Sequence, residues 1–415
     1  MLRNYLITAY KVFMRRKLFT AINLACIVLT LVILMVITAL LESAFYPSGV
    51  EGKSDRFLQV IMVRMESPDG RSVNKSPLGF KLIDQYLKAI AGVERVATLT
   101  GADPVSVYQG KRVSTLEMRR VDADYWKVLD FTVLAGRLPT AQDDIDARQV
   151  AVINRSSAIK LFDGAPAEAI GQKIDVGGQS FEIVGVVDNA MHLNAYGDLW
   201  APISTFPSSG YRQQLSGSFS ALILAHKAND LPRIQREVAR IATTVVTDDP
   251  AQYKTVYFWA DSKLDLFARA TVGSEQTADS GAFTLLAMLG TAMVLFMLLP
   301  ALNLVNLNTG RILERHTEIG IRKAFGATSA TLAGQLIVEN ILLCLAGGLI
   351  ALGACALVLA WIASAGVLPY MKIEMDWAVF GYGLVLAAIF GVLSGVLPAW
   401  KMSRLDPVHA LKGST

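Results

Sequence analysis

Long apolar runs occur near both ends of this chain, one near the start and three near the end. The first run without a formal charge covers Leu18–Leu41, and about 20 apolar residues suffice for a helix to cross a bilayer. The later runs cover Ser280–Gly310, the stretch between Lys323 and Lys372, and Trp377–Trp400. The pattern predicts four transmembrane helices, one before and three after a long mixed segment.

A cleaved signal peptide is the alternative for the first run, and a retained anchor is favoured over it. The apolar stretch is too long for a signal peptide, and cleavage after Ala44 would leave Glu42 where a small residue is required. The predicted segments are a cytoplasmic amphipathic leader (1–17), spans at 18–42, 280–310, 331–362 and 377–400, an extracytoplasmic domain (43–279), a cytoplasmic loop (311–330), a short external loop (363–376) and a cytoplasmic tail (401–415).

Basic residues flank the spans on one side only. The predicted cytoplasmic segments contain Arg3, Lys11, Arg15, Arg16, Lys17, Arg311, Arg315, Arg322, Lys323, Lys401, Arg404 and Lys412. Because Lys and Arg collect on the cytoplasmic side of short loops, both termini are expected in the cytoplasm and residues 43–279 outside it. The basic surplus then faces anionic lipid headgroups and not nucleic acid.

The mixed segment reads as an α+β domain with two β-α-β units. The first has a strand at Phe57–Val63, a helix capped by Ser76 and Pro77, and a strand at Val93–Leu99. The second has a strand at Phe219–Leu224, a helix after Asp230 and Pro232 with Ile234, Val238, Ile241 and Val245 at helical spacing, and a strand at Thr255–Trp259. Two such units predict a ferredoxin-like subdomain, split here by a β-rich insertion from about Val105 to Pro207.

One hairpin is predicted inside the insertion. Lys173–Val176 and Phe181–Val187 are strand-like, and Gly177 and Gly178 between them suit the positive φ of a tight turn.

Composition agrees with a mixed membrane protein, since 53% of the 415 residues are hydrophobic and 18% are charged. The three cysteines, Cys26, Cys344 and Cys355, all lie in apolar runs, so we expect them to act as small apolar residues and not as a disulfide framework.

Motifs for enzyme chemistry are absent from the sequence. It contains no G-x-x-x-x-G-K-[ST] phosphate loop, H-E-x-x-H or G-x-S-x-G, and its four histidines are scattered. We therefore expect a non-enzymatic subunit without a cofactor or metal of its own.

The run Glu314-Arg315-His316-Thr317-Glu318-Ile319-Gly320-Ile321-Arg322-Lys323-Ala324-Phe325-Gly326-Ala327 resembles the cytoplasmic loop signature of the MacB/FtsX family of ABC permeases. Three more stretches of the chain resemble the family in order and spacing. They are Val121–Trp126 followed by Gly136-Arg137, Val150–Asn154 followed by Leu161-Phe162, and Pro398–Lys401 followed by Leu405–Val408. The resemblance implies a MacB-like periplasmic core domain and a stand-alone permease subunit of the bacterial inner membrane, since family members with a fused ATPase place it before the first span. It further implies a homodimer or paralogous heterodimer around separate ATPase subunits, which bind ATP and magnesium. Movement is then transmitted through the membrane without a conventional channel (mechanotransmission, type VII).

The basic loop is the candidate ATPase-coupling site. Its residues are Arg311, Glu314, Arg315, Glu318, Ile319, Arg322, Lys323 and Gly326. The i, i+4 spacing of Glu314, Glu318 and Arg322 predicts that the second span continues as a charged helix, with Gly326 as a stop and Thr328 or Ser329 as the next cap. Charge alone leaves a solvated loop without a partner as an equal alternative, and the resemblance favours coupling.

Three weaker signals lie in the spans. Gly391 and Gly395, with Ala387 and Ala399, form a small-residue stripe that suits close helix packing, within one subunit or between two. Pro300 could mark a bend, and Glu339 is expected near the cytoplasmic interface instead of in a proton relay.

The predicted function is therefore export of a drug, peptide or toxin, with a periplasmic adaptor and outer-membrane channel as further partners. Lipoprotein release is one alternative within the family. An FtsX-like regulator of a cell-wall hydrolase is another, and a sensor or scaffold without an ATPase is a third class.

Overall fold

The computed structural model describes residues 14, 17–110, 112–314, 321, 325, 328–365 and a few separate positions between 381 and 396. The chain divides into two compact units. One contains Ala44–Leu285 and is called here the α+β unit; the other contains the helices on either side of it in sequence and is called the helical unit.

Ten strands of the α+β unit form one continuous sheet. They are β1 (Phe57–Val60), β4 (Val93–Thr100), β5 (Asp103–Gln109), β6 (Arg112–Val121), β7 (Val133–Gly136), β8 (Val150–Asn154), β9 (Lys173–Val176), β10 (Gln179–Val187), β11 (Leu199–Pro202) and β12 (Phe219–Ala225). Their order is β1-β12-β4-β6-β11-β8-β10-β9-β5, with β7 added beside β10. A second, three-stranded sheet has the order β13 (Thr255–Tyr257), β2 (Met62–Glu66) and β3 (Val73–Pro77).

The ferredoxin-like prediction accounts for one end of the large sheet. β12 lies between β1 and β4 and is antiparallel to both, as this arrangement requires. α7 (Leu231–Ala242) begins after Asp230 and buries Ile234 and Val238 completely, as the helical spacing predicts. The fourth strand departs from the pattern, because β13 pairs with β2 and only Asp261 reaches β1, through a bridge to Gln59.

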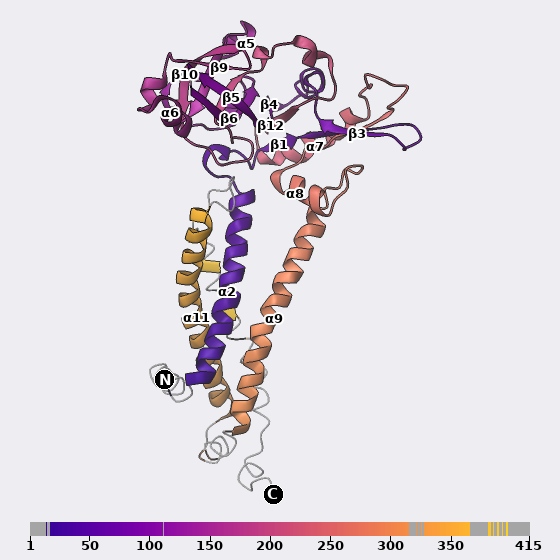
Figure 1. The fold of residues 1–415 in the computed structure, drawn as a ribbon. Helices are drawn as coiled ribbons and strands as arrows, with labels where there is room; N and C mark the ends of the chain where they lie inside the picture. Colours follow the sequence, from indigo (N-terminus) through magenta and orange to yellow (C-terminus); the bar gives the residue numbers. More distant parts are fainter. Residues whose placement is uncertain are drawn as a thin grey trace. The chain divides into compact units, whose positions relative to one another are not determined.

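The helix predicted after Ser76 and Pro77 begins later than expected. Both residues lie in β3, which pairs antiparallel with β2, so the prediction that they cap a helix is wrong. The helical turn starts after Gly79 as α3 (Phe80–Leu82) and continues as a π-helical turn, Ile83–Leu87. Pro77 is accommodated because it ends its strand, where a missing N–H costs little. Figure 1 shows the resulting β2–β3 hairpin extending to one side of the unit.

The β-rich insertion closes on itself. β5 pairs with both β9 and β6, so the strands β6, β11, β8, β10, β9 and β5 complete a circuit. Buried apolar side chains fill this barrel, including Leu116, Ile153, Ile174, Phe181 and Ile183. The predicted glycine hairpin is confirmed, since Val176 pairs with Gln179 and both intervening glycines have positive φ.

Short helices complete the α+β unit. They are α4 (Tyr125–Val128), α5 (Ala141–Ile145), α6 (Arg155–Phe162) and α8 (Lys263–Thr271), with 3-10 turns at Gly49–Glu51, Pro166–Ala169, Ile203–Thr205, Ser209–Gln213 and Ala228–Asp230. α4 contributes Tyr125 and Trp126 to an aromatic cluster with Phe131 and Trp200. The family-like pattern around Val121–Trp126 therefore builds core, not surface.

Among the described residues, the helical unit is built from three long helices, α2 (Lys17–Phe45), α9 (Ala282–Glu314) and α11 (Ser329–Ala365). The last residues of α2 and the first residues of α9 belong to the α+β unit. In the part of the chain that the structure describes, two helices are long and apolar enough to cross a membrane, Thr20–Phe45 and Ile337–Ala365, and Ala282–Leu298 is a shorter apolar helix. The predicted fourth span at 377–400 lies almost wholly outside the described residues, so four spans remain a prediction.

α2 packs against α11 through small and branched residues. Ile27 and Leu31 contact Leu343 and Cys344, and farther along Met35 contacts Cys355. These two cysteines thus occupy apolar helix contacts, as expected. Glu339 is only 4% exposed and accepts a hydrogen bond from Gln335 Nε2 at 3.1 Å, so this carboxylate is buried.

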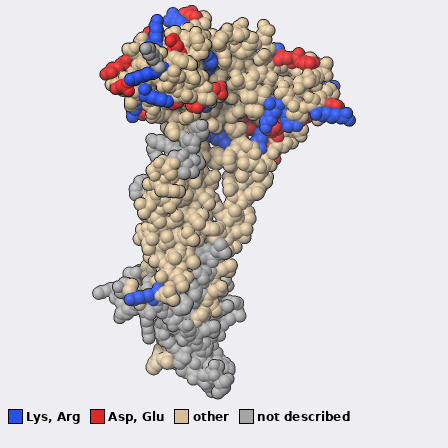
Figure 2. All heavy atoms as spheres, in the orientation of Figure 1, with Lys and Arg blue, Asp and Glu red and all other residues tan. Residues whose placement is uncertain are grey.

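Among the described residues, charged side chains are distributed unequally between the two units. On the face drawn in Figure 2, the Lys, Arg, Asp and Glu side chains of the described residues gather on the α+β unit, and the described helix surface is almost uncharged. An uncharged helix surface is suited to lipid, whereas the charged unit is suited to water.

Candidate functional site

The structure places only part of the predicted coupling site. Arg311 and Glu314 lie in the last turns of α9, which continues as helix at least to Glu314. Arg315, Glu318, Ile319, Arg322, Lys323 and Gly326 lie outside the described residues, as do Gly391 and Gly395. The coupling role of the loop and the packing role of the two glycines remain predictions.

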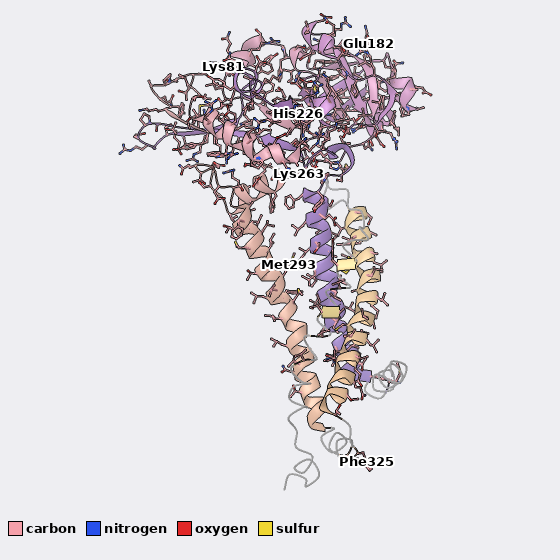
Figure 3. All side chains as sticks on the ribbon, turned by 180° about the vertical axis from the view of Figure 1, so that it is seen from behind. Lys81, Glu182, His226, Lys263, Met293 and Phe325 are labelled. Carbon is pink, nitrogen blue, oxygen red and sulfur yellow. The ribbon has the colours of Figure 1, made fainter. Side chains whose placement is uncertain are left out.

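Three described residues lie in or beside the loop. Phe325 is 89% exposed (Figure 3), and Ile321 is also exposed. Thr328 precedes α11, and its Oγ1 accepts a hydrogen bond from the Thr331 N–H at 3.2 Å. Thr328 is therefore the helix cap, one of the two residues predicted for this role.

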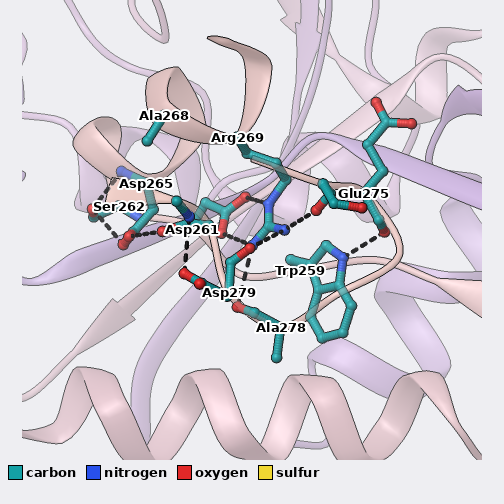
Figure 4. A network of polar contacts seen from close by, with 12 residues as sticks. Trp259, Asp261, Ser262, Asp265, Ala268, Arg269, Glu275, Ala278 and Asp279 are labelled. Carbon is teal, nitrogen blue, oxygen red and sulfur yellow. Dashed lines mark hydrogen bonds and ion pairs between the residues drawn. The ribbon is translucent and has the colours of Figure 1, made fainter. Parts of the chain in front are cut away.

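A dense polar cluster lies at the other end of α9. We call it the Arg269 junction; it consists of Asp261, Asp265, Arg269, Ser280 and the main chain of residues 274–279 (Figure 4). Arg269 donates from Nε to Asp261 Oδ2 at 2.7 Å and from Nη2 to Asp261 Oδ1 at 2.9 Å. Both side chains are less than 10% exposed. A buried bidentate pair of this kind fixes the orientation of both groups.

The same guanidinium holds the chain that leads into α9. Its Nη1 donates to the Ser274 carbonyl oxygen at 2.6 Å and to the Thr277 carbonyl oxygen at 2.8 Å, with a longer contact to Asp279. Arg269 also lies over the ring of Trp259, whose Nε1 donates to the Glu275 carbonyl oxygen. One side chain thus closes the loop from residue 273 to residue 281.

Asp261 attaches this cluster to the sheet. Its N–H donates to the Gln59 carbonyl oxygen at 2.9 Å, and the Gln59 N–H donates back at 2.7 Å, so Asp261 is bonded to β1. Burial raises the pKa of Asp261 above its ordinary value, and the hydrogen bonds from Arg269 oppose this shift. The hydrogen bonds from Arg269 thus favour the charged form of this carboxylate, against the effect of burial.

Asp265 connects the start of α8 with the start of α9. It forms a capping box with Ser262, and its Oδ1 accepts from Ser280 Oγ at 2.6 Å. The Ser280 hydroxyl in turn accepts from the Ala282 N–H, the first residue of α9. The first turn of α9 is therefore bonded through two side chains to α8.

Two glycines allow the loop to close. A Cβ on Gly273 would overlap the Ser280 carbonyl oxygen, and Gly281 has φ of +77° and lies against Gly273. The main chain can approach itself this closely only without side chains at these positions.

Two small cavities flank the Arg269–Asp261 pair. One, of about 170 Å³, is bounded by β2, β13 and α8; the other, of about 440 Å³, is bounded by α7 and the residues before α9. No group of three or more His, Cys, Asp or Glu side chains that could hold a metal ion is found among the described residues.

Sequence reasoning missed the Arg269 junction. A local signal was present, since Ser262 followed three residues later by Asp265 is a helix-start pattern. The partners of Arg269, however, are main-chain carbonyl groups, and their positions depend on how the loop folds.

The fold and the site together define a class of protein. An α+β unit is inserted between the first apolar helix and the later helices, and a buried polar cluster fixes it to the start of α9. The sequence matches the family model for the MacB-like periplasmic core domain over residues 20–241 and the model for the FtsX-like permease C-terminal region over residues 290–407. The chain belongs to the MacB/FtsX family of ABC transporter permeases.

Curated relatives agree with this assignment. The uncharacterized ABC transporter permease YknZ of Bacillus subtilis (strain 168) is 24% identical over 331 residues, which cover 79% of this chain and 77% of YknZ. A probable export ATP-binding/permease protein MacB of Pseudomonas entomophila is 27% identical over 72% of this chain and 44% of its own length. A macrolide export ATP-binding/permease protein MacB of Mannheimia succiniciproducens is 23% identical over 77% of this chain and 47% of its own length. The chain thus spans less than half the length of these two MacB relatives.

Solved structures that are similar to this chain include two extracytoplasmic domains. The extracellular domain of the noncanonic ABC-type transporter YknZ from Gram-positive bacteria matches with a TM-score of 0.37 and 18% identity, over 48% of this chain and 98% of that domain. The periplasmic region of MacB from Actinobacillus actinomycetemcomitans matches with a TM-score of 0.38 and 15% identity, over 55% of this chain and 98% of that region.

Proposed function

We propose that this permease transmits ATP-driven movement from a separate ATPase to its α+β unit, and that α9 carries the movement. The observation that supports this most directly is the Arg269 junction, which fixes the start of α9 to the edge of the sheet. A helix fixed at its start passes displacement of its other end to whatever it is fixed to. The mechanism is mechanotransmission instead of passage through a channel.

The length of α9 suits this role. It has 33 residues, which at 1.5 Å each make a rod of about 50 Å, longer than the roughly 30 Å hydrocarbon core of a bilayer. Its last turns contain Arg311 and Glu314, the first two residues of the predicted coupling site. A continuous helix therefore connects the residues proposed to contact the ATPase with the Arg269 junction.

The proposed assembly contains two permease copies, identical or paralogous, and ATPase subunits that bind ATP and magnesium. Relatives named ATP-binding/permease proteins support the need for an ATPase, because their names join the two activities and this chain matches less than half of their length. We place the assembly in a bacterial inner membrane with the α+β unit outside the cytoplasm. An adaptor and an outer-membrane channel complete the proposal.

Export of a drug, peptide or toxin is the proposed task. Relatives named for macrolide export and for probable syringafactin export support it. Release of lipoproteins and regulation of a cell-wall hydrolase are the alternatives within the family. A knockout that changes resistance or secretion supports export, whereas one that changes only cell-wall hydrolysis supports regulation.

The mechanical proposal is tested by hydrogen exchange on the complete complex. The permease is purified from its native membranes with its copurifying ATPase, placed in lipid nanodiscs, and compared with and without ATP and vanadate. We expect nucleotide to change amide exchange in residues 44–285, and Arg269→Met to remove this change while the ATPase remains bound. Arg315→Glu is expected to lose the ATPase itself.

The matched control is Arg112→Met, which removes an ion pair with Asp163 whose side chains are 69% and 71% exposed. An exposed pair contributes little, so the nucleotide response should survive. Purification without any ATPase, or a full nucleotide response in Arg269→Met, would refute the mechanical proposal.

A further inference from the structure

α8 carries the cations of the two most buried ion pairs in the α+β unit. Among the Lys and Arg ion pairs described in residues 44–285, only two have both side chains less than 15% exposed. One joins Arg269 to Asp261 and the other joins Lys263 to Glu51, at 2.5 Å. Lys263 begins α8, and Arg269 lies near its end.

The second pair lies in the chain that follows α2. Glu51 comes soon after Phe45, the last residue of α2, and its side chain is 2% exposed. Besides Lys263 Nζ, the carboxylate accepts from the main-chain N–H and from Nδ2 of Asn194, at 3.0 and 2.9 Å. A buried carboxylate with three donors is held in one position, and removal of its cation leaves a buried charge without compensation.

The local main chain is shaped for this contact. Gly49 has φ of +50°, and a Cβ there would lie 2.8 Å from the His192 ring. The Ser48 hydroxyl is 3.0 Å from His192 Nε2, and Lys53 pairs with Asp130. The segment after α2 is thus bound on one side to the body of the unit and on the other to α8.

A third contact joins the same two elements. The rings of Phe45 and Phe267 lie 5.7 Å apart, and Phe267 is in the middle of α8. Along its nine residues α8 therefore contacts the end of α2, the chain after α2, and the chain before α9. Figure 3 labels Lys263, the residue through which α8 pairs with Glu51 in the chain after α2.

We infer that α8 is a crossbar between the segments that leave α2 and enter α9, with Lys263 and Glu51 as positioning residues for transmission. This inference rests on the proposed function and extends it, because it makes α2 and α9 move together. The reason is mechanical: a short helix held at both ends by buried ion pairs cannot follow one segment without moving the other or breaking a pair. Breaking a buried pair is strongly unfavourable.

A purely local role for Lys263 makes a different prediction. If the pair only stabilised its surroundings, its loss would loosen residues 46–54 and leave the distant loop at 273–282 intact. If α8 is a crossbar, loss of Lys263 releases its first turn, and the loop bound by Arg269 loosens as well. Lys263 has no described hydrogen bond or ion pair to residues 273–282. Faster exchange in that loop would therefore show that the effect of the substitution is transmitted through α8.

The experiment is hydrogen exchange on the full chain in lipid nanodiscs, without ATPase or nucleotide. Protected amides are available in both segments, since the N–H groups of Gly52 and Ser54 and that of Gly273 are hydrogen-bonded. For Lys263→Met we expect exchange to rise on the order of tenfold or more in both 46–54 and 273–282. Lys263→Arg, which keeps the charge, should restore protection in both.

Lys53→Met is the matched control. It removes an ion pair from the same segment, but Lys53 pairs with Asp130 and has no described bond to α8. Exchange should then rise in 46–54 alone. If Lys263→Met does not yield folded protein, Glu51→Gln tests the same pair with the shape of the side chain kept.

A rise confined to 46–54 in Lys263→Met or Glu51→Gln overturns the crossbar. Because this measurement needs neither ATPase nor nucleotide, it can be read even if the mechanical proposal fails. Conversely, a wild-type complex without a nucleotide response would refute the proposed function and leave the ion-pair result standing.

Discussion

The Gly136-Arg137 stretch, which resembles the family pattern, has a structural role that can be followed at single residues. Gly136 has φ of +71°, and a Cβ there would overlap the Val184 carbonyl oxygen, so only glycine fits before Arg137. Arg137 then donates to both carboxylate oxygens of Asp143, at 2.6 and 3.0 Å. Asp143 also caps α5 through Thr140. The Gly-Arg pair in the sequence is thus a structural clamp on a short helix.

We predict that the Arg137–Asp143 ion pair makes the stability of the folded chain depend on pH. Hydrogen bonds from Arg137 hold the pKa of Asp143 well below its usual range. An aspartate with a lowered folded-state pKa stabilises the fold above its ordinary pKa, about 3.9, and loses that contribution as the pH falls through the folded-state value. Asp143→Asn should therefore cost about 1–2 kcal/mol at pH 7 and progressively less below pH 4.

Thermal unfolding of the full chain in detergent, followed from pH 7 to pH 3, measures this difference. Arg112→Gln is the control, because its ion pair is exposed and little change is expected at any pH. A gap between wild type and Asp143→Asn that stays constant down to pH 3 would contradict the assignment.

At the scale of elements, α2 and α11 meet at a glycine. A Cβ on Gly347 of α11 would lie 2.7 Å from Ile27 Cγ2 and 3.6 Å from Leu24 Cδ1 of α2. Ile27 is β-branched and 5% exposed, so its methyl group has little room to move. Close approach at small residues is how helices pack when both lie in lipid.

Gly347→Val should therefore separate the two helices locally. Overpacking of a tight contact typically costs about 1–3 kcal/mol, and we expect a lower unfolding temperature of the purified full chain. Gly353→Ala, on the same helix, is the control, because a Cβ there meets nothing within 4 Å. Equal unfolding temperatures for the two variants would show that the α2–α11 contact is not tight at Gly347.

Elements with a strong local pattern were predictable from the sequence. α7 follows from buried residues at helical spacing, and the β9–β10 hairpin follows from two adjacent glycines. β3 was not predictable in this way, because Ser76 and Pro77 also suit the start of a helix. Their conformation is decided by the pairing of β3 with β2. Closure of the barrel and the Arg269 junction depend on contacts between distant residues, which periodicity does not reveal.

At the scale of the whole molecule, the described residues separate charge from apolar surface. Charged side chains gather on the α+β unit, and α2 and α11 present long stretches without charge. The orientation across the membrane rests on sequence: Arg311 and Lys323 flank the loop between the second and third spans, and Lys17 precedes the first. By the positive-inside rule these residues should face the cytoplasm.

Cysteine labelling tests this orientation on the full chain. Val246 is 66% exposed in the α+β unit and Phe325 is 89% exposed in the loop, so a cysteine at either position is accessible to reagent. A membrane-impermeant maleimide should label Val246→Cys in intact cells, with the outer membrane opened where one is present, and Phe325→Cys only after the inner membrane is permeabilised. The native Cys344 and Cys355 are buried, but Cys26 is partly exposed, so the unsubstituted chain is labelled in parallel to measure the background. Labelling of Phe325→Cys in intact cells, or its absence for Val246→Cys, would reverse the topology. It would also remove the proposed cytoplasmic ATPase contact from the end of α9, because Phe325 follows Glu314, the last described residue of α9, by only 11 residues of chain.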